Sequence, residues 1–319
     1  MPAKAVVVCG TGERVSDRLL VLGWHNVAGT WSFPSAPGAG RRGLERQLRF
    51  LAHAGNVVRL DEALDALVAG RTLPPRAVAL TFDDGYADNL TLAAPLLERL
   101  GFPATFFLVP GLLSGEVRAW WEVLGWAFGR ASSTALAWEG ASYAVATASQ
   151  RRSAYEGVAE RLKRRNREWR AAAMTDLLDR LAPAGTPPGP ELFLDWSGAR
   201  ELARRGFAIG SHSTYHAILS EEEAAAQQAD LAESRRRLEE ELRTPAPLLA
   251  YPNGTRRDYD AVTIAAAAWA GHRYAVTTLD GWNRSSVPPF EIRRSVMYPE
   301  RGLLDLGLTA RQLIRPTHG

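Results

Sequence analysis

Short apolar runs alternate with longer amphipathic segments along most of the chain. Runs rich in β-branched and aromatic residues predict buried strands at 56–60, 76–82, 103–110, 206–212, 247–252 and 273–278. Apolar positions at helical spacing predict helices at 61–70, 89–101, 197–206, 221–243 and 260–271. Strands that alternate with helices of this length predict βαβ units and a parallel sheet.

A parallel α/β arrangement leaves two architectures open, a TIM-like barrel (complete or incomplete) and an open doubly wound sheet. In both, reactive groups gather at the carboxyl ends of the strands. Asp83 and Asp84 directly follow the run at 76–82, His212 ends the run at 206–212, and a turn follows Tyr251. We therefore expect these side chains to meet at one edge of the sheet.

Residues 111–200 interrupt the alternation of predicted strands and helices. They contain the aromatic segment "AWWEVLGWAFG", an Ala/Ser-rich stretch, a basic helix and the loop "APAGTPPGPE". We interpret the segment as a helical insertion at about 111–195 within a single catalytic domain that covers 1–319. Asp88 and Asn89 are expected to cap the helix that follows them.

Composition and charge place the chain among ordinary globular proteins. The 319 residues are 46% hydrophobic and 23% charged, with a net charge of +3. The basic runs at 161–170 and 234–243 are interpreted as solvated helix faces, so no nucleic-acid partner is predicted. No apolar run is long enough for a membrane span, and no signal peptide is visible. We therefore expect a cytoplasmic location, and export through a partner stays open as an alternative.

Candidate metal ligands come from histidine and aspartate, because the single cysteine, Cys9, excludes an intrachain disulfide and a thiol cluster. His212 and His216 are four residues apart, and on a helical turn such a pair shares one face. An aspartate from another strand end would complete a set of two histidines and one carboxylate, which leaves coordination positions open. A divalent ion would also relieve the repulsion between Asp83 and Asp84.

Two motifs carry a resemblance to a known family. "TFDDGY" (81–86) followed by "SHSTYH" (211–216) resembles the first two motifs of the NodB-like polysaccharide deacetylases, carbohydrate esterase family four. The segments "LVLGWHNV", "FAIGSHSTYHAILS" and "LLAYPNG" resemble the branch that acts on bacterial exopolysaccharides such as poly-N-acetylglucosamine. The resemblance covers most of residues 20–298. It implies a distorted or incomplete (β/α) TIM-like barrel, the NodB homology fold.

The resemblance also implies roles for individual residues. Asp83 would be the general base, and Asp84, His212 and His216 would bind a divalent metal. Zinc is expected, although nickel, cobalt or iron would suit the same ligands. The metal would polarise the acetamide carbonyl and activate water, and the backbone N–H of Asn253 would stabilise the oxyanion. The products would be a free amine and acetate.

The chain departs from the family pattern at two points. Ala250 stands where the family has an arginine that pairs with the base, and we hypothesise that Arg293 or Arg294 replaces it. The late Leu-x-His motif, which supplies the general acid, is not visible, and His318 is interpreted as part of the tail. His25, which ends the segment "LVLGWH", is a candidate for a catalytic or substrate role.

The leading functional prediction is a metal-dependent enzyme that deacetylates an N-acetylated amino-sugar polymer or oligosaccharide. Tyr86, Tyr251, Trp121 and Trp282 are the candidate substrate-binding side chains, because sugar rings stack on aromatic faces. One alternative is a related amide hydrolase that acts on a small molecule or on a glycolipid-linked or nucleotide-linked sugar. A second alternative is a sugar-binding pseudoenzyme.

Overall fold

A computed structural model describes residues 16–34 and 40–297 of the chain; Cys9 and His318 lie outside the described residues. The strands are β1 (Leu19–Trp24), β2 (Asn56–Val57), β3 (Ala77–Phe82), β4 (Thr105–Leu108), β5 (Ala135–Trp138), β6 (Ala141–Ala144), β7 (Ala208–Ser211), β8 (Leu248–Ala250), β9 (Tyr274–Val276), β10 (Trp282–Asn283) and β11 (Ser295–Val296). The α-helices are α1 (Gly40–Ala54), α2 (Leu60–Val68), α3 (Ala94–Leu100), α4 (Pro110–Leu113), α5 (Trp120–Gly129), α6 (Ala148–Leu162), α7 (Arg167–Leu181), α8 (Trp196–Arg204), α9 (Ala224–Leu242) and α10 (Ala261–Trp269). Shorter helical turns cover Asn89–Ala93, Pro190–Leu192 and Leu219–Glu221.

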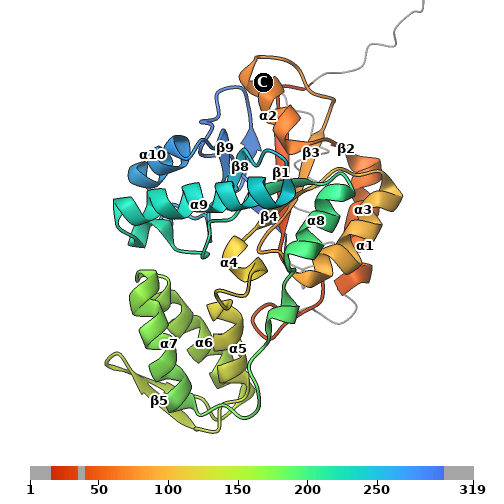
Figure 1. Ribbon diagram of the computed structural model, residues 1–319. Coiled ribbons are helices and arrows are strands. Elements are labelled where there is room, and N and C mark those ends of the chain that lie inside the picture. The colour runs from red at the N-terminus through yellow and green to blue at the C-terminus, as the bar shows by residue number, and fades with distance from the viewer. Residues whose placement is uncertain (1–15, 35–39, 298–319) are drawn as a thin grey trace, which may run out of the picture.

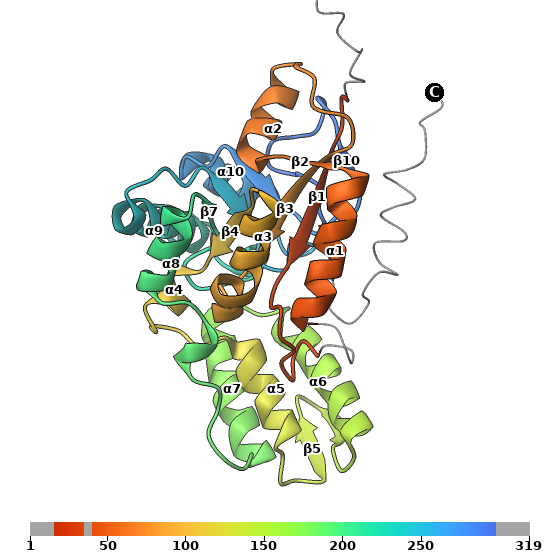
Figure 2. The same ribbon diagram turned by 90° about the vertical axis from the view of Figure 1, so that its right-hand side faces the viewer.

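The main sheet has the strand order β10-β1-β3-β4-β7-β8-β9, and all neighbours from β1 to β9 run parallel. Their carboxyl ends therefore meet at one edge, as the alternation of strands and helices predicts. Helices α1, α3 and α8 cover one part of the outer face, and α9 and α10 cover another (Figures 1 and 2).

The sheet curls around an inner core. Along β1, alternate side chains separate into two clusters: Leu20 and Leu22 pack outward with α1 and α3, whereas Leu19 and Val21 pack inward. Leu64 of α2 belongs to the inner cluster together with residues of β3, β8 and β9. Helix α2 thus closes the end of the curled sheet opposite the carboxyl edge, as expected for a barrel with a filled interior.

One irregular segment joins the two ends of the parallel sheet. Ile292 pairs with Val276 of β9, and three residues further on β11 begins to pair in parallel with β1. The N–H of Met297 then donates to the carbonyl of Gly23 at 2.7 Å. The distorted (β/α) barrel is thereby confirmed, and the open doubly wound sheet is excluded.

Helices α5, α6 and α7 and the β5–β6 hairpin form a separate layer below the barrel in Figure 1, whereas α4 lies beside the barrel. Helices α5, α6 and α7 share a hydrophobic cluster of their own, which includes Leu124, Val158 and Leu177. The β5–β6 hairpin was not predicted; its turn has positive φ at Glu139 (49°) and Gly140 (71°), the geometry of a tight two-residue hairpin. Among the described residues, no helix is both long enough and apolar enough to cross a membrane.

Candidate metal centre and active site

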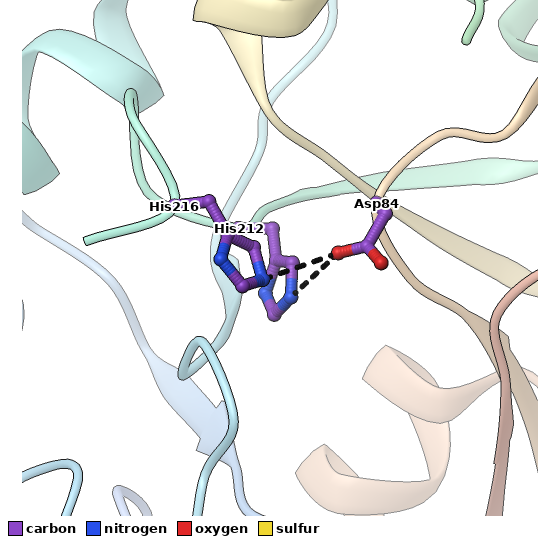
Figure 3. Close-up of side chains that lie close together, drawn as sticks. All are labelled: Asp84, His212 and His216. Atoms are coloured by element: carbon purple, nitrogen blue, oxygen red, sulfur yellow. Dashed lines mark ion pairs between the residues drawn. The ribbon is translucent and has the colours of Figure 1, made fainter. Parts of the chain in front are cut away.

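Three side chains at the carboxyl edge of the sheet converge on one point (Figure 3). Oδ1 of Asp84 lies 3.3 Å from Nε2 of His212 and 3.3 Å from Nε2 of His216. All three side chains are buried, and their ligand atoms lie within 4.8 Å of one another. The set of two histidines and one carboxylate that was predicted from the sequence is therefore assembled in space.

The local backbone that brings the two histidines together is not helical, so the helical-spacing argument was wrong. His212 follows β7 directly, and residues 212–218 form a loop. Ser213 (φ 59°) and His216 (φ 50°) adopt left-handed backbone conformations. This path folds the loop back, so the two rings lie 4.9 Å apart with an interplanar angle of 76°.

Neighbouring elements hold the histidine loop on both sides. The N–H of Gly111 donates to the carbonyl of Thr214 at 2.9 Å. The N–H of Thr214 donates to the buried carboxyl of Asp230 at 2.5 Å, and its hydroxyl donates to the Asp230 carbonyl at 2.7 Å. A Cβ at Gly111 would lie 2.6 Å from the Thr214 carbonyl oxygen, so only glycine allows this approach.

Hydrogen bonding leaves Nε2 of His212 free to bind a metal ion. Nδ1 of His212 lies 2.7 Å from the carbonyl oxygen of Ala250, a contact in which Nδ1 carries the proton. Asp84 Oδ1 is buried, and among the residues that the structure describes only the two imidazoles approach it. Burial alone would raise the pKa of Asp84, but the two imidazoles hold that pKa well below its usual value. An ionised carboxylate beside two imidazole nitrogens is a donor set that suits zinc and similar divalent ions.

Asp83 is paired with an arginine. Nη1 and Nη2 of Arg294 each lie 2.6 Å from one carboxylate oxygen of Asp83, and Nη1 also donates to the Thr81 hydroxyl at 3.1 Å. Burial alone would raise the pKa of Asp83, but the charge of Arg294 outweighs it and the pKa is lowered. Arg294 thus keeps the carboxyl ionised and fixes its orientation.

Of the two arginines proposed for this role, the structure brings only Arg294 to Asp83. The side chain of Arg293 instead donates to the carbonyl of Asp280 at 3.0 Å. Arg294 reaches the site because it lies in the segment that closes the barrel beside β1. Gly23 of β1 makes room for it, since a Cβ there would lie 3.0 Å from Cδ of Arg294.

His25 lies beside Asp83, with Nε2 4.0 Å from Asp83 Oδ2, and its ring stacks on Phe33. The side chain of Asn89 donates to the His25 carbonyl at 2.8 Å. The Asp88 side chain does not cap the helical turn that follows. Its carboxylate instead accepts hydrogen bonds from the backbone N–H groups of Val27 and Ala28. The predicted capping role is therefore wrong, and both residues hold the loop that carries His25.

A cavity of about 610 Å³ opens over these groups. Asn253 lines it with positive φ (59°), and its backbone N–H makes no hydrogen bond within the described part of the chain. Tyr251 also lines the cavity, but its hydroxyl donates to the Phe290 carbonyl at 3.2 Å.

Among the described residues, four of the eight non-glycine positions with positive φ lie at this site, namely Asp84, Ser213, His216 and Asn253. Such conformations are unfavourable and concentrate at functional sites.

Trp121 contacts a metal-ligand candidate directly. Its ring lies 4.3 Å from the ring of His216, and its Nε1 donates to the Tyr86 hydroxyl at 2.9 Å. The Tyr86 hydroxyl in turn donates to the buried Glu122 carboxyl at 2.8 Å. Trp121 lines the cavity, whereas Tyr86 supports it from behind. No sequence pattern marked Glu122; it lies beside Tyr86 because it is on the buried face of α5.

Trp282 is not part of this cavity. It lies in β10, where the Arg18 guanidinium is 5.8 Å from its ring centroid and its ring packs on the outer core. The wall facing the strand ends comes instead from α6 of the insertion, through Arg152, Glu156 and Glu160.

Comparison with known proteins identifies relatives of this site and fold. The sequence matches the family described as polysaccharide deacetylase over residues 70–275, more than half of the chain. It is 31% identical over 88 residues to the poly-β-1,6-N-acetyl-D-glucosamine N-deacetylase of Escherichia coli K12. That alignment covers 27% of this chain and 13% of the relative, so the chain spans only a small part of its length.

Solved structures with the same fold come from several bacteria. The deacetylase PplD of Streptococcus pyogenes, in complex with acetate, has a TM-score of 0.61 at 16% identity, and the alignment covers 94% of this chain and 99% of that one. The BpsB deacetylase domain of Bordetella bronchiseptica has a TM-score of 0.58 at 19% identity over 88% and 96% of the two chains. IcaB of Ammonifex degensii has a TM-score of 0.56 at 20% identity over 93% and 98%. At these identities the likeness shows a shared fold.

Proposed function

The chain belongs to the polysaccharide deacetylase family, and on that premise we propose that it is a metal-dependent hydrolase of N-acetyl groups on an amino-sugar polymer or oligosaccharide. One observation carries the proposal: the Asp84, His212 and His216 cluster and the Asp83–Arg294 pair share one cavity. The name of the E. coli relative supports an N-acetylglucosamine polymer as the substrate class.

Asp84, His212 and His216 would hold the metal ion. Their burial, the protonated Nδ1 of His212 and the lone contact of Asp84 Oδ1 with imidazole nitrogens all suit a divalent cation. When bound, such an ion supplies Lewis-acid chemistry, which polarises an acetamide carbonyl and acidifies water. Zinc fits this donor set, and nickel, cobalt and iron fit it as well.

The remaining groups supply proton transfer and charge stabilisation. Asp83, held by Arg294, accepts the proton of the attacking water as that oxygen bonds to the acetamide carbon. The unpaired N–H of Asn253 donates to the oxyanion that forms. The C–N bond then breaks, the leaving amine takes up a proton, and acetate and the free amine result. His25, 4.0 Å from Asp83, is the group we assign to deliver that proton.

The substrate would occupy the cavity between the strand ends and α6. A volume of about 610 Å³ lies within the range of ligand-binding cavities and accommodates a sugar residue with parts of its neighbours. Trp121 lines it and offers apolar surface beside the polar groups, whereas Tyr251 is fully buried beneath the cavity wall and offers none. We treat residues 1–319 as one catalytic domain whose insertion, at about 111–195, forms the outer wall of this cavity.

The test is acetate release from β-1,6-linked and β-1,4-linked N-acetylglucosamine oligomers. We expect release by the native protein, loss in Asp83→Asn, and native rates in Asp179→Asn, an exposed aspartate of α7 that makes the same change in charge. Release from neither oligomer, by protein that binds zinc, would contradict the amino-sugar substrate and direct the search to small amides.

A further inference from the structure

A second groove lies where the insertion meets the barrel. It has a volume of about 430 Å³, and we call it the basic groove. Two tryptophans and four arginines line it, namely Trp138, Trp169, Arg161, Arg164, Arg165 and Arg257. Most of these residues belong to the basic run at 161–170, which was interpreted from the sequence as a solvated helix face.

Two of the arginines build the groove. Nη2 of Arg164 lies 2.8 Å from the Asp258 carboxylate, and its Nη1 donates to the Arg257 carbonyl at 3.2 Å. Arg161 donates to the Glu139 carbonyl at 2.9 Å. The Arg164 bonds fix the turn after α6 to the loop that follows β8, and the Arg161 bond fixes α6 to the turn between β5 and β6.

The other two arginines remain available for a ligand. The side chains of Arg165 and Arg257 are exposed, and neither forms an ion pair within residues 16–34 and 40–297. The Arg165 guanidinium lies 5.3 Å from the ring centroid of the half-buried Trp169, whose ring is 6.1 Å from that of Trp138. An indole face beside an unpaired guanidinium can bind a sugar ring and an anionic substituent together.

The basic groove continues from the catalytic cavity. Glu160 lines both, and Thr255, which lines the cavity, is two residues from Arg257. A polymer that places an acetamide at the metal centre can therefore extend into the groove. A nucleic acid is a poorer match, because Glu139 and Glu160 also line the groove and interrupt its positive charge.

We infer that the basic groove binds an anionic part of the glycan, a sugar carrying a carboxylate or phosphate, beyond the residue that is deacetylated. The inference rests on the proposed function for the sugar that carries the acetamide, and it requires a glycan that bears acidic groups in addition to its N-acetylated amino sugars. It assigns the basic run at 161–170 a binding role, and so it revises the interpretation made from the sequence.

The test compares the binding of three probes: oligogalacturonate, a phosphorylated glucan and a neutral cello-oligosaccharide. The variant is Arg165→Gln with Arg257→Gln, and the matched control is Arg204→Gln with Arg236→Gln, two exposed arginines of α8 and α9. We expect one or both anionic probes to bind about tenfold more weakly to the groove variant, and native binding by the control. Added salt should weaken the native binding, and the neutral probe should not distinguish the proteins.

Binding of oligogalacturonate alone would identify a carboxylate as the ligand group, and binding of the phosphorylated glucan alone would identify a phosphate. Equal binding of the anionic probes by the groove variant and the native protein would overturn the inference. So would a single-stranded RNA that binds through these two arginines when neither anionic glycan does. Acetate release from short neutral N-acetylglucosamine oligomers separates the two proposals. The groove variant should release acetate at the native rate. If the native protein itself releases no acetate, the proposed function is contradicted, and the binding test of the groove remains valid.

Discussion

Arg294, in the segment that closes the barrel, makes two parallel hydrogen bonds to Asp83 at the end of β3, each 2.6 Å long. The family pattern places an arginine at the position of Ala250, on β8. Here the guanidinium approaches the same carboxylate from beside β1. An aspartate–arginine pair is therefore present, although its arginine does not stand at the position that the family resemblance implied.

We predict that Arg294→Lys lowers the turnover number about 10- to 100-fold, because an ammonium cannot make both bonds to Asp83. Arg293→Lys is the matched neighbour, since Arg293 contacts the Asp280 carbonyl and does not reach Asp83. Steady-state kinetics of the two variants check this. Equal losses in both, or a loss only in Arg293→Lys, would contradict the assignment of Arg294.

We predict that Gly23→Ala lowers turnover without weakening zinc binding. The added Cβ would lie 3.0 Å from Cδ of Arg294 and 3.2 Å from the Thr81 hydroxyl, so it displaces the arginine from Asp83. Overpacking of this kind also costs about 1–3 kcal/mol of stability. Calorimetric zinc titration and acetate release on one preparation separate the effects. Unchanged turnover would mean that Arg294 need not hold its position for catalysis.

We predict that Trp121→Leu weakens zinc binding about tenfold. Nδ1 of His216 is buried and has no hydrogen-bond partner in the described part of the chain, so packing on Trp121, with ring centroids 4.3 Å apart, orients the ring. Trp121→Phe, which keeps an aromatic ring beside His216, should lose less zinc affinity than Trp121→Leu. If Trp121→Leu raises KM while zinc affinity stays native, Trp121 contacts the substrate and does not position the metal ligand.

We predict that Asp230→Asn stabilises the protein above pH 6. Burial raises the pKa of the Asp230 carboxyl to about 6, so the folded state retains a proton that the unfolded state loses near pH 4. The contribution of Asp230 to the free energy of unfolding therefore falls as the pH rises from about 4 to 6, by up to about 3 kcal/mol. An asparagine oxygen can still accept the Thr214 N–H.

Urea unfolding at pH 4 and pH 8 tests this prediction. The variant should match the native protein at pH 4 and exceed it at pH 8. Burial lowers the pKa of His272 to about 4, but His272 titrates in both proteins and so cancels in the comparison. A variant less stable than the native protein at pH 8 would show that the Thr214 N–H requires the charged carboxylate.

The parallel sheet and the strand ends that carry the candidate metal ligands could be predicted from the sequence because both follow from local patterns, whereas the barrel and the choice of Asp84 as the ligand came from the family resemblance. Apolar runs marked the strands, and the acids and histidines stood where those runs end. The choice between Arg293 and Arg294 could not be made, since it depends on how residues 292–296 pair with both β9 and β1. The same non-local packing places Trp282 outside the cavity and links Trp121, which lines the cavity, to Tyr86 and Glu122 behind it.

The histidine pair shows how a correct prediction can rest on an incorrect reason. A spacing of four suggested a helical turn, whereas His212 and His216 meet through a loop with two left-handed residues. Contacts with Gly111 and Asp230, distant in sequence, hold that loop. Spacing alone carries no information about such contacts.

The most direct test of the central claim is a zinc titration of chelated protein in which bound zinc and acetate release are measured on the same sample. We predict that release from N-acetylglucosamine oligomers is absent in the chelated protein and rises in proportion to zinc, up to one ion per chain. Asp84→Asn and His216→Ala should bind zinc far more weakly and release little acetate. Full activity after chelation, or native zinc binding by both variants, would contradict a metal centre at Asp84, His212 and His216.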